Sequence, residues 1–509
     1  PLKSYGMKKI KLIIIVAFSV ILSTSFLSNY FEITKNLEIF NNIYRELETS
    51  YVENINPGDL MKKAIDRMLE TLDPWTVYIP ESEIEDFRTR HITGDYGGIG
   101  SGIRKIDDFV VITEPFKNSP ADLSGLKIGD KIISINGEDM EKESTENVSN
   151  LLKGTPGTSV TVTIERNKSV KKMEITRDKI HNSTVPHYEM IEDQIGYIKL
   201  NKFQRKSASE VKTALRELDT LSNNNLNGLI LDLRDNGGGV LSQCLEIVNL
   251  FIPKGDTMLI AKGKDATWDK EYIASKKPLY EKLPIVVLIN ERSASASEIV
   301  AGCLQDLDRG IVLGKTSFGK GVIQQNKKIA YNTQLKVTVA KYYTPSGRCI
   351  QKIDPDKMNY NNSDSLQSVF FTKNGRKVFG GGGIDPDVSI EDKETLPMLI
   401  ALFQENCIFK FGNQFFESIN FPDSPKEFVL SDGDYDLFKQ YLEDDNFQFS
   451  MYSEEVLKEL QESLEKEFYF EDMKEELIML EKSILNNKKQ DLIRHEDEIR
   501  EIISKDLIL

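Results

Sequence analysis

The chain has 509 residues, 39% of them hydrophobic and 28% charged, which is ordinary for globular protein and enough for about two to four domains. Its net charge of −15 argues against nucleic acid as a main partner, because the phosphate backbone binds basic surfaces. The four cysteines are scattered, with no Cys-x-x-Cys pair and no adjacent histidine, so a structural metal site is not expected.

The first 28 residues carry a targeting pattern. Met7–Lys11 is basic, Leu12–Leu22 is almost wholly apolar, and Ser23–Ser25 are small. This order is typical of a secretory signal peptide, and the apolar run is short for a membrane span. We therefore expect residues 1–28 to be a signal peptide or an N-terminal membrane anchor. The rest of the chain is then expected to work outside the cytoplasm, in the periplasm.

Residues 29–93 show helical periodicity. Apolar residues recur at spacings of three and four from Leu37 to Leu47 and again from Leu60 to Leu69, with a Pro57-Gly58 break between them. The segment Leu72-Asp-Pro74 should end the second helix, because proline disfavours helix at the residue before it. We predict an N-terminal helical region.

Residues 94–180 predict a small β-rich module. A strand at Phe109–Ile112 is followed by a capped helical turn at Ser119–Gly125 and by a strand that ends in an Asn-Gly turn at Gly129–Gly137. A helix at Glu146–Leu152 and an alternating strand from Val160 complete the pattern.

Through Ser119–Gly137 this module resembles a PDZ domain. In such a domain a glycine-rich loop surrounds a peptide carboxylate with backbone N–H groups, and an edge strand accepts the peptide. By itself the Gly-Gly-Ile-Gly stretch is more simply a turn. Combined with the second motif, it predicts a binding site for substrate tails at Gly97, Gly98, Ile99 and Gly100.

Residues 181–393 alternate between strand and helix patterns, which predicts an α/β sheet with helices against its faces. The expected strands are apolar runs, at Ile195–Leu200, Gly228–Leu233, Pro284–Ile289, Ile311–Leu313 and Leu335–Ala340. The expected helices have inward-facing apolar residues, at Ala208–Leu218, at Leu241–Phe251 and after Ser295.

Residues 394–509 are acidic and helical in pattern. Leu457, Leu460 and Leu464, and later Ile478 and Ile484, recur irregularly among glutamates and lysines. We expect a solvated helical appendage that could serve as an interaction arm, for an adaptor or for a second copy of the chain.

The stretch Asn290–Gly302 has the pattern of a catalytic turn. It follows an apolar strand and leads into a helix, so that a hydroxyl there lies beside helix N–H groups that have no intrahelical partner. Ser293, Ser295 and Ser297 are all candidate nucleophiles. Ser295 also forms an S-x-x-E capping box with Glu298, which by itself explains a serine at that position.

A serine nucleophile needs a base, and no histidine lies between residues 284 and 341. A distant histidine could still be recruited. Lysine is the other base available to serine, when burial disfavours its ammonium form. Lys320 lies between two glycines that permit an inward-pointing loop, although a solvated loop is the simpler explanation of that pattern alone. The N–H of Ala296 could stabilise an oxyanion, and a second donor could come from the glycine turn Arg234–Gly239.

Two glycine motifs could be mistaken for nucleotide sites. Gly310–Thr316 resembles a phosphate loop, but it lacks one residue between its glycines and is followed by strand-like sequence. Gly237–Gly239 has neither the spacing nor the downstream acidic residue of a dinucleotide site. We expect no nucleotide cofactor.

The complete set of motifs resembles the carboxy-terminal processing, or tail-specific, proteases of peptidase family S41. The match runs in family order from about residue 36 to residue 392, and the segments after residue 394 lie outside it. The matching motifs are Leu72–Pro74, Leu231–Gly239, Ser293–Gly302, Gly314–Gln324, Tyr342–Arg348 and Gly383–Val388.

The resemblance implies an α/β, multidomain protein with a ClpP/crotonase-like protease core at 181–393, a PDZ module at 94–180 and helical regions at 29–93 and 394–509. It implies Ser295 as nucleophile, Lys320 as base and Gln324 as the residue that orients the lysine, with backbone oxyanion donors at Ala296 and Gly238. No metal and no cofactor are implied.

The implied activity is that of a serine endopeptidase that recognises unstructured, apolar C-terminal tails through the PDZ module. Arg166 matches a basic position implicated in gating, and Trp75, where relatives often carry other residues, has no implied role. The alternative is a catalytically dormant PDZ scaffold that only binds tails. A third hypothesis is activity held off until a partner engages the C-terminal helices.

Overall fold

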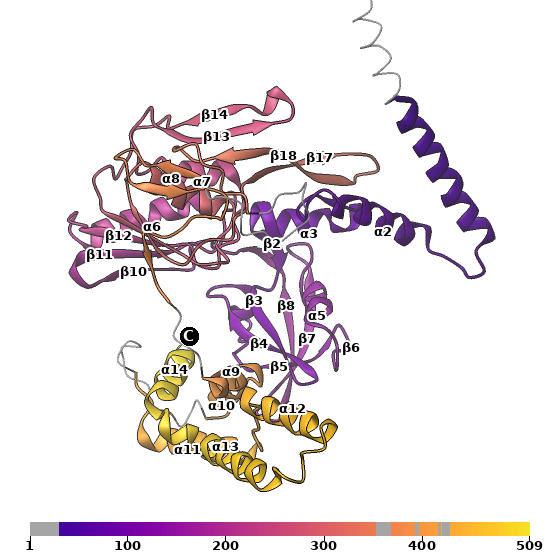
Figure 1. Ribbon diagram of the computed structural model, residues 1–509, viewed down its shortest axis with the longest axis vertical. Helices are drawn as coiled ribbons and strands as arrows, with labels where there is room; N and C mark the ends of the chain where they lie inside the picture. Colours follow the sequence, from indigo (N-terminus) through magenta and orange to yellow (C-terminus); the bar gives the residue numbers. More distant parts are fainter. Residues whose placement is uncertain (1–29, 353–367, 392–395, 416–418, 420–427, 509) are drawn as a thin grey trace, which may run out of the picture. The chain divides into compact units, whose positions relative to one another are not determined.

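The computed structural model describes residues 30–352, 368–391, 396–415, 419 and 428–508 (Figure 1). The predicted signal peptide or anchor at residues 1–28 lies outside the described residues. Among the helices of the described part, none is long and apolar enough to cross a membrane.

The chain divides into two compact units. The first unit comprises Pro1–Phe87, Gly255–Ala274 and Gly319–Ile384, and the second comprises Arg88–Lys254, Ser275–Phe318 and Asp385–Leu509. The protease segment expected at residues 181–393 is therefore shared between both units. The reason is strand pairing, because β13 (Thr257–Gly263) pairs with Lys270–Ile273 and with Gln334–Tyr343, whereas the strand before it, Gly228–Asp232, belongs to a different sheet.

The first unit contains the N-terminal helices and an antiparallel sheet. Residues 30–50 are helical, and α2 (Pro57–Glu70) begins at Asn56, whose side chain caps the helix, and ends before the predicted stop. The sheet has the order β1-β18-β13-β14, with β17 also paired to β18. Its remaining strands are β1 (Val77–Ile79), β14 (Lys270–Ile273), β17 (Val322–Lys328) and β18 (Gln334–Tyr343), beside a hairpin of β19 (Val369–Phe371) and β20 (Lys377–Phe379).

The second unit is built around a mainly parallel sheet of order β10-β11-β12-β15-β16-β21, in which β10 alone of the described strands is antiparallel to its neighbour. Buried apolar runs form its central strands, as expected for a parallel sheet covered by helices. The α/β prediction is confirmed. The strands are β10 (His187–Ile191), β11 (Ile195–Lys199), β12 (Gly228–Asp232), β15 (Ile285–Ile289), β16 (Ile311–Gly314) and β21 (Val388–Ser389), with helices α6 (Ser207–Leu221), α7 (Leu241–Val248) and α8 (Ala296–Asp306).

The carboxyl ends of β12 and β15 position the candidate site. These strands are parallel neighbours, with Leu231 opposite Val287 and Asp232 opposite Leu288. Their following turns therefore emerge at the same edge of the sheet, which is where α/β proteins build sites. The helix after β15, α8, packs against α7.

The β-rich module also lies in the second unit, after the short helix α3 (Ile84–Arg88) that ends the first unit. Its sheet has the order β3-β4-β5-β7-β8, with β6 on β5, and a separate ribbon pairs β2 with β9. The predicted strands and both short helices are present, around a core of aliphatic side chains. The elements are β2 (Asp95–Gly98), β3 (Ser101–Ile106), β4 (Phe109–Pro115), α4 (Pro120–Leu123), β5 (Lys131–Ile135), β6 (Glu138–Asp139), α5 (Thr145–Leu152), β7 (Ser159–Arg166), β8 (Ser169–Thr176) and β9 (Asp178–His181).

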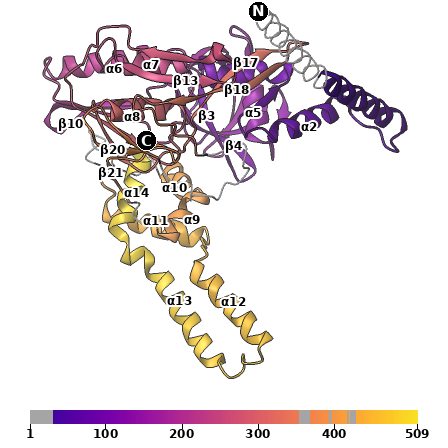
Figure 2. The same cartoon turned by 45° about the horizontal axis from the view of Figure 1, so that its top comes forward.

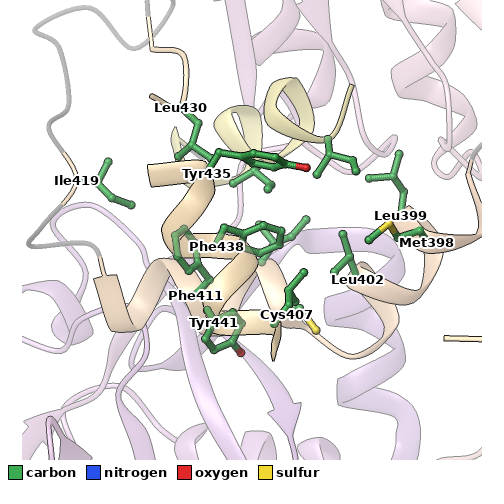
Figure 3. Close-up of a cluster of buried hydrophobic side chains, with 14 of the residues drawn as sticks. Met398, Leu399, Leu402, Cys407, Phe411, Ile419, Leu430, Tyr435, Phe438 and Tyr441 are labelled. Carbon is green, nitrogen blue, oxygen red and sulfur yellow. The ribbon is translucent and has the colours of Figure 1, made fainter. Parts of the chain in front are cut away.

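The C-terminal region is a folded helical domain, so the prediction of a solvated appendage is wrong. Aromatic side chains of α10 and α11 pack edge to face and tilted in its core, with Phe411 and Phe438 at 5.0 Å between ring centroids (Figure 3). The leucine repeats had suggested only a surface helix. The helices are α9 (Pro397–Gln404), α10 (Cys407–Phe415), α11 (Asp432–Asp444), α12 (Tyr452–Lys466), α13 (Lys474–Arg494) and α14 (Glu496–Ile508).

Helices α12 and α13 form a long hairpin (Figure 2). It is held by a small apolar cluster of Leu457, Leu464 and Leu477. The irregular leucine pattern thus reflects a narrow seam between two helices, while the other faces remain polar.

Phe438→Ala is expected to lower the free energy of unfolding of the C-terminal domain by about 3–5 kcal/mol, because its ring is fully buried and its removal leaves a cavity. Phe468→Ala is the matched control, since that ring is 91% exposed and its loss should change stability by less than about 0.5 kcal/mol. Urea unfolding of both variants measures the difference. Equal effects would contradict the proposed core.

Candidate active site

Ser295 occupies a strained turn between β15 and α8. Its φ of 56° and ψ of −110° are unusual for a residue with a side chain, and such conformations persist only where the surroundings impose them. The N–H of Ser295 donates to the carboxylate of Glu298 at 2.7 Å, as the predicted capping box requires. The other oxygen of this buried carboxylate accepts from Ser317 at 2.6 Å, so the turn is tied to a second segment of the chain.

The hydroxyls on either side of Ser295 are bound to the main chain. Ser293 donates to the carbonyl oxygen of Leu233 at 2.8 Å, and Ser297 donates to that of Asn236 at 2.7 Å. Both serines are fully buried, whereas Ser295 is half-buried. The structure therefore separates three serines that the sequence pattern left equivalent, because two of them serve to hold the β12 turn.

The glycine turn after β12 lies directly against Ser295. At Gly238, where φ is 95°, a β-carbon would lie 2.7 Å from the carbonyl oxygen of Ala294 and 2.9 Å from the amide nitrogen of Ala296. Only glycine permits this approach. The turn brings together Gly238, Ser295 and Ala296, the residues expected to form the oxyanion site.

The two N–H groups predicted to bind an oxyanion differ in the hydrogen-bond acceptors near them. The N–H of Ala296 belongs to the first residue of α8, where the helix itself offers no acceptor. The N–H of Gly238 donates to the side-chain oxygen of Asn236 at 2.9 Å. Gly238 would have to give up this bond before it could bind an oxyanion.

An ion pair between a buried carboxylate and an exposed arginine anchors the start of the same turn. Asp232 is fully buried and binds Arg234 at 2.7 Å, and the phenol of Tyr197 donates to it at 2.7 Å. Burial raises the pKa of Asp232, but the hydrogen bonds from Arg234 and Tyr197 outweigh burial and hold that pKa below its usual value. Burial, with the adjacent Asp232, raises the pKa of Tyr197 to about 12. The carboxylate therefore has a structural role.

Lys320 belongs to the first unit, where three neighbours hold it. Its ammonium donates to the side-chain oxygen of Gln324 at 3.0 Å and lies 5.2 Å from the ring centroid of Trp75. The amide of Gln324 donates in turn to the main-chain oxygen of Trp75 at 2.5 Å. The hydroxyl of Tyr342 donates to the carbonyl oxygen of Lys320 at 2.8 Å. Trp75, for which no role was expected, thus contacts both Lys320 and Gln324.

The glycines beside Lys320 serve close packing. A β-carbon at Gly321 would lie 2.8 Å from the amide nitrogen of Gln351, and the N–H of Gly321 donates to the Gln351 side chain at 2.7 Å. The carbonyl of Gly319 accepts from Lys352 at 2.9 Å. In the second unit, the N–H of Phe318 donates to the carbonyl of Ser293 at 3.0 Å, and Lys320 follows two residues later along the chain. Because of these close contacts, the segment around Lys320 is packed against other parts of the chain and is not a solvated loop.

Comparison with known proteins identifies the family. Residues 194–358 match peptidase family S41, residues 111–166 match a PDZ domain, and residues 398–509 match the C-terminal helical domain of a probable PDZ-protease. A probable CtpA-like serine protease of Staphylococcus epidermidis (strain ATCC 12228 / FDA PCI 1200) is 30% identical over 407 residues, which cover 76% of this chain and 81% of that protein. The chain belongs to peptidase family S41.

Two further proteins are similar to this S41 chain over part of their length. A probable CtpA-like serine protease of Staphylococcus aureus (strain MRSA252) is 35% identical over 327 residues, which are 63% of this chain. The matched part spans only 64% of the length of that relative. The solved structure of a photosystem II D1 C-terminal processing protease is 25% identical, with a TM-score of 0.37. The matched part covers 69% of this chain and 92% of the chain in that structure. The expected family is confirmed, and residues 398–509, left outside the resemblance, prove to match a domain of PDZ-proteases.

The PDZ domain carries a narrow groove between β3 and α5. A cavity of about 30 Å³ lies there, and its walls combine apolar side chains with hydroxyls and a lysine, from Tyr96, Ile99, Gly100, Ser101, Ile103, Ser149, Leu152 and Lys153. Of the four predicted tail-binding residues, Ile99 and Gly100 line it. The spacing of Ser149 and Leu152 along one face of α5 could have indicated the opposite wall.

Gly97 and Gly98 lie outside that cavity. They belong to β2 and pair with Lys179 and Asp178 of β9. A β-carbon at Gly97 would lie 2.0 Å from the carbonyl oxygen of Gly154. Glycine at position 97 is therefore required by the close approach of a second main-chain segment.

Arg166 is held inside the PDZ domain. Its guanidinium binds the fully buried carboxylate of Asp130 through two hydrogen bonds, at 2.5 and 2.6 Å, and donates to the carbonyl of Gly125 at 2.8 Å. Bidentate pairs of this kind are strong. A gating role for Arg166 would require this pairing to break.

Among the residues that the structure describes, no group of three or more His, Cys, Asp or Glu could hold a metal ion.

Proposed function

We propose that this S41 chain is a serine endopeptidase in which Ser295 is the nucleophile and Lys320 the general base. The observation that carries this proposal is the setting of Ser295, which sits on a strained turn beside the first N–H of α8, while Ser293 and Ser297 are bound to the main chain. The spacing of 25 positions from Ser295 to Lys320 matches that of the family, and the hydrogen bond from the Lys320 ammonium to Gln324 supports the role of Lys320.

The proposed reaction proceeds through an acyl-enzyme. Lys320, as the free amine, takes the proton of the Ser295 hydroxyl while its oxygen attacks the scissile carbonyl. The N–H of Ala296, and that of Gly238 once it leaves Asn236, stabilise the resulting oxyanion. The Lys320 ammonium then gives its proton to the departing amine as the C–N bond breaks. Water next attacks the acyl-enzyme while the Lys320 amine takes its proton, and Lys320 passes that proton to the Ser295 oxygen as the ester bond breaks.

The proposed substrates are proteins with unstructured, apolar C-terminal tails. The groove on the PDZ domain supports this, because its walls from Ile99, Ile103 and Leu152 are apolar and the adjacent edge of β3 can add a strand. The small cavity favours a small final side chain. We further propose that the protein works outside the cytoplasm, on the basis of the basic and apolar segments at residues 7–22.

Trapping of the acyl-enzyme tests the proposed chemistry. The full chain is mixed with a protein that ends in an apolar tail, quenched in acid and digested with trypsin. An acyl mass on the peptide Ser293–Arg309, lost in Ser295→Ala, is the expected result. Rapid cleavage with no adduct in that peptide would contradict the proposal. Tail binding without any cleavage would favour the dormant scaffold.

Ile103→Glu is expected to weaken binding of an apolar-tailed peptide at least about tenfold, because a carboxylate would then face the peptide's own carboxylate in a narrow groove. Fluorescence anisotropy in the Ser295→Ala background measures affinity without cleavage. Val170→Glu adds the same charge at a side chain of the PDZ domain that is 66% exposed, and should leave affinity unchanged. Unchanged binding by Ile103→Glu would show that tails dock elsewhere.

A further inference from the structure

We propose that Trp75 is a positioning residue for the base, holding Lys320 both through Gln324 and by direct contact of its ring with the ammonium. This inference rests on the proposed role of Lys320 in proton transfer. All three residues lie in the first unit, although Trp75 and Gln324 are 249 positions apart in the chain.

The segment that carries Trp75 is fixed by Asp73. This carboxylate is 8% exposed, and it accepts from the N–H of Trp75 at 2.8 Å and from the N–H and hydroxyl of Thr76 at 2.7 and 3.0 Å. The hydroxyl of Thr76 accepts from the N–H of Thr338 in β18 at 3.3 Å. The main-chain oxygen and the ring of Trp75 are therefore presented from an anchored turn.

The first route from Trp75 to Lys320 runs through the side chain of Gln324. Because the amide NH₂ of Gln324 is committed to the main-chain oxygen of Trp75, its carbonyl oxygen must face the other way, toward the ammonium of Lys320. Trp75 thereby selects the orientation in which Gln324 accepts from Lys320. A donor presented by Gln324 would repel the ammonium.

The second route is the contact between charge and ring. The distance of 5.2 Å from the Lys320 ammonium to the ring centroid is within the range of a cation–π interaction. A neutral amine gains almost nothing from this contact. The ring therefore favours Lys320 after it has accepted a proton, which is its state when Ser295 has been deprotonated.

This asymmetry has a distinctive effect on the pH dependence of cleavage. At low pH the resting lysine is already an ammonium, so the ring stabilises the resting and the transition state alike. At high pH the resting lysine is an amine, and the contact is gained only on the way to the transition state. Loss of the ring should therefore lower the plateau at high pH, shift the midpoint of the acid limb to lower pH, and leave the rate at low pH unchanged.

Other titratable groups on the segments that hold Lys320 must be kept constant in the test. Asp73 lies two residues before Trp75, and Tyr342 and Lys336 come from β18. Burial lowers the pKa of Lys336, and Asp73 opposes that effect. None of the substitutions below changes these groups.

The experiment measures kcat and KM against pH for Trp75→Leu and Trp75→Phe in the full chain, with a tail-bearing protein as substrate. We expect Trp75→Leu to lower the plateau of kcat about fivefold, or about 1 kcal/mol, and to move the midpoint down by about 0.7 pH units. KM should not change. Trp75→Phe, which keeps a weaker ring face and most of the volume, should lie between Trp75→Leu and the native chain.

Trp268→Leu is the matched control, because it makes the same change at the chain's other tryptophan in the same unit. A uniform fall in rate with an unmoved midpoint would mean that Trp75 is merely structural and would overturn the inference, as would an unchanged profile. If Trp75→Leu fails to fold, the profile of Trp75→Phe decides in the same way. Ser295→Ala in the same assay distinguishes failure of this inference from failure of the proposed function, since activity in that variant would overturn the proposed function itself.

Discussion

Ser295→Ala is expected to lower kcat for cleavage of an apolar-tailed protein by about 10⁴-fold or more. In the proposed reaction this hydroxyl forms the covalent bond to the substrate, and neither neighbour can replace it because Ser293 and Ser297 are bound to Leu233 and Asn236. The rate of product formation, followed by gel or mass spectrometry with the full chain, measures the effect.

Folding and tail binding should survive in Ser295→Ala, because the methyl group keeps the turn and the N–H bond to Glu298 is made by the main chain. Ser209→Ala, which makes the same change at an exposed position of α6, should cleave at the native rate. Retention of more than a small fraction of activity by Ser295→Ala would mean that another residue attacks the substrate.

Lys320→Met is expected to reduce kcat to a similar extent. Methionine keeps most of the aliphatic stem but cannot accept a proton, so the Ser295 hydroxyl stays a weak nucleophile. Lys327→Met is a suitable control, since that lysine is exposed on the same strand, β17. Steady-state rates of the two variants over a range of pH provide the comparison.

The double variant of Ser295→Ala and Lys320→Met discriminates a dyad from two independent contributions. Residues that act as one unit are strongly non-additive, so the double variant should be no slower than either single variant. A loss equal to the product of the two single losses would contradict joint action. Such a result would leave Ser295 as nucleophile but assign its base elsewhere.

Much of the fold could be predicted because its elements have strong local patterns. The apolar run of β15 and the periodicity of α8 lie next to each other in sequence, and the predicted strands and helices of the PDZ domain all formed. Strands β13 and β17 were missed, because their residues lack clear alternation and are held by pairing with β18. Gln324 lies on β17, so the strand that presents it came only from the structure.

For the C-terminal domain, the sequence pattern led to a wrong prediction of how much of the chain is buried. Its leucine spacing is irregular, which suggested a polar arm, yet Phe411, Tyr435 and Phe438 are fully buried together. Aromatic residues spread over several short helices give a weak periodic signal in any one of them. Their burial depends on how α10, α11 and α14 pack, which no local window contains.

The sequence by itself determined the family motifs, the strand and helix on either side of Ser295, and the absence of a nearby histidine in the chain. These follow from local periodicity and from spacing along the chain. Only the tertiary structure decided that Ser293 and Ser297 serve the main chain, that the N–H of Gly238 is bound to Asn236, and that Trp75 covers Lys320. The physical reason is that these contacts form only when the chain folds. A hydrogen bond or ring contact produces no recognisable spacing of residues along the sequence.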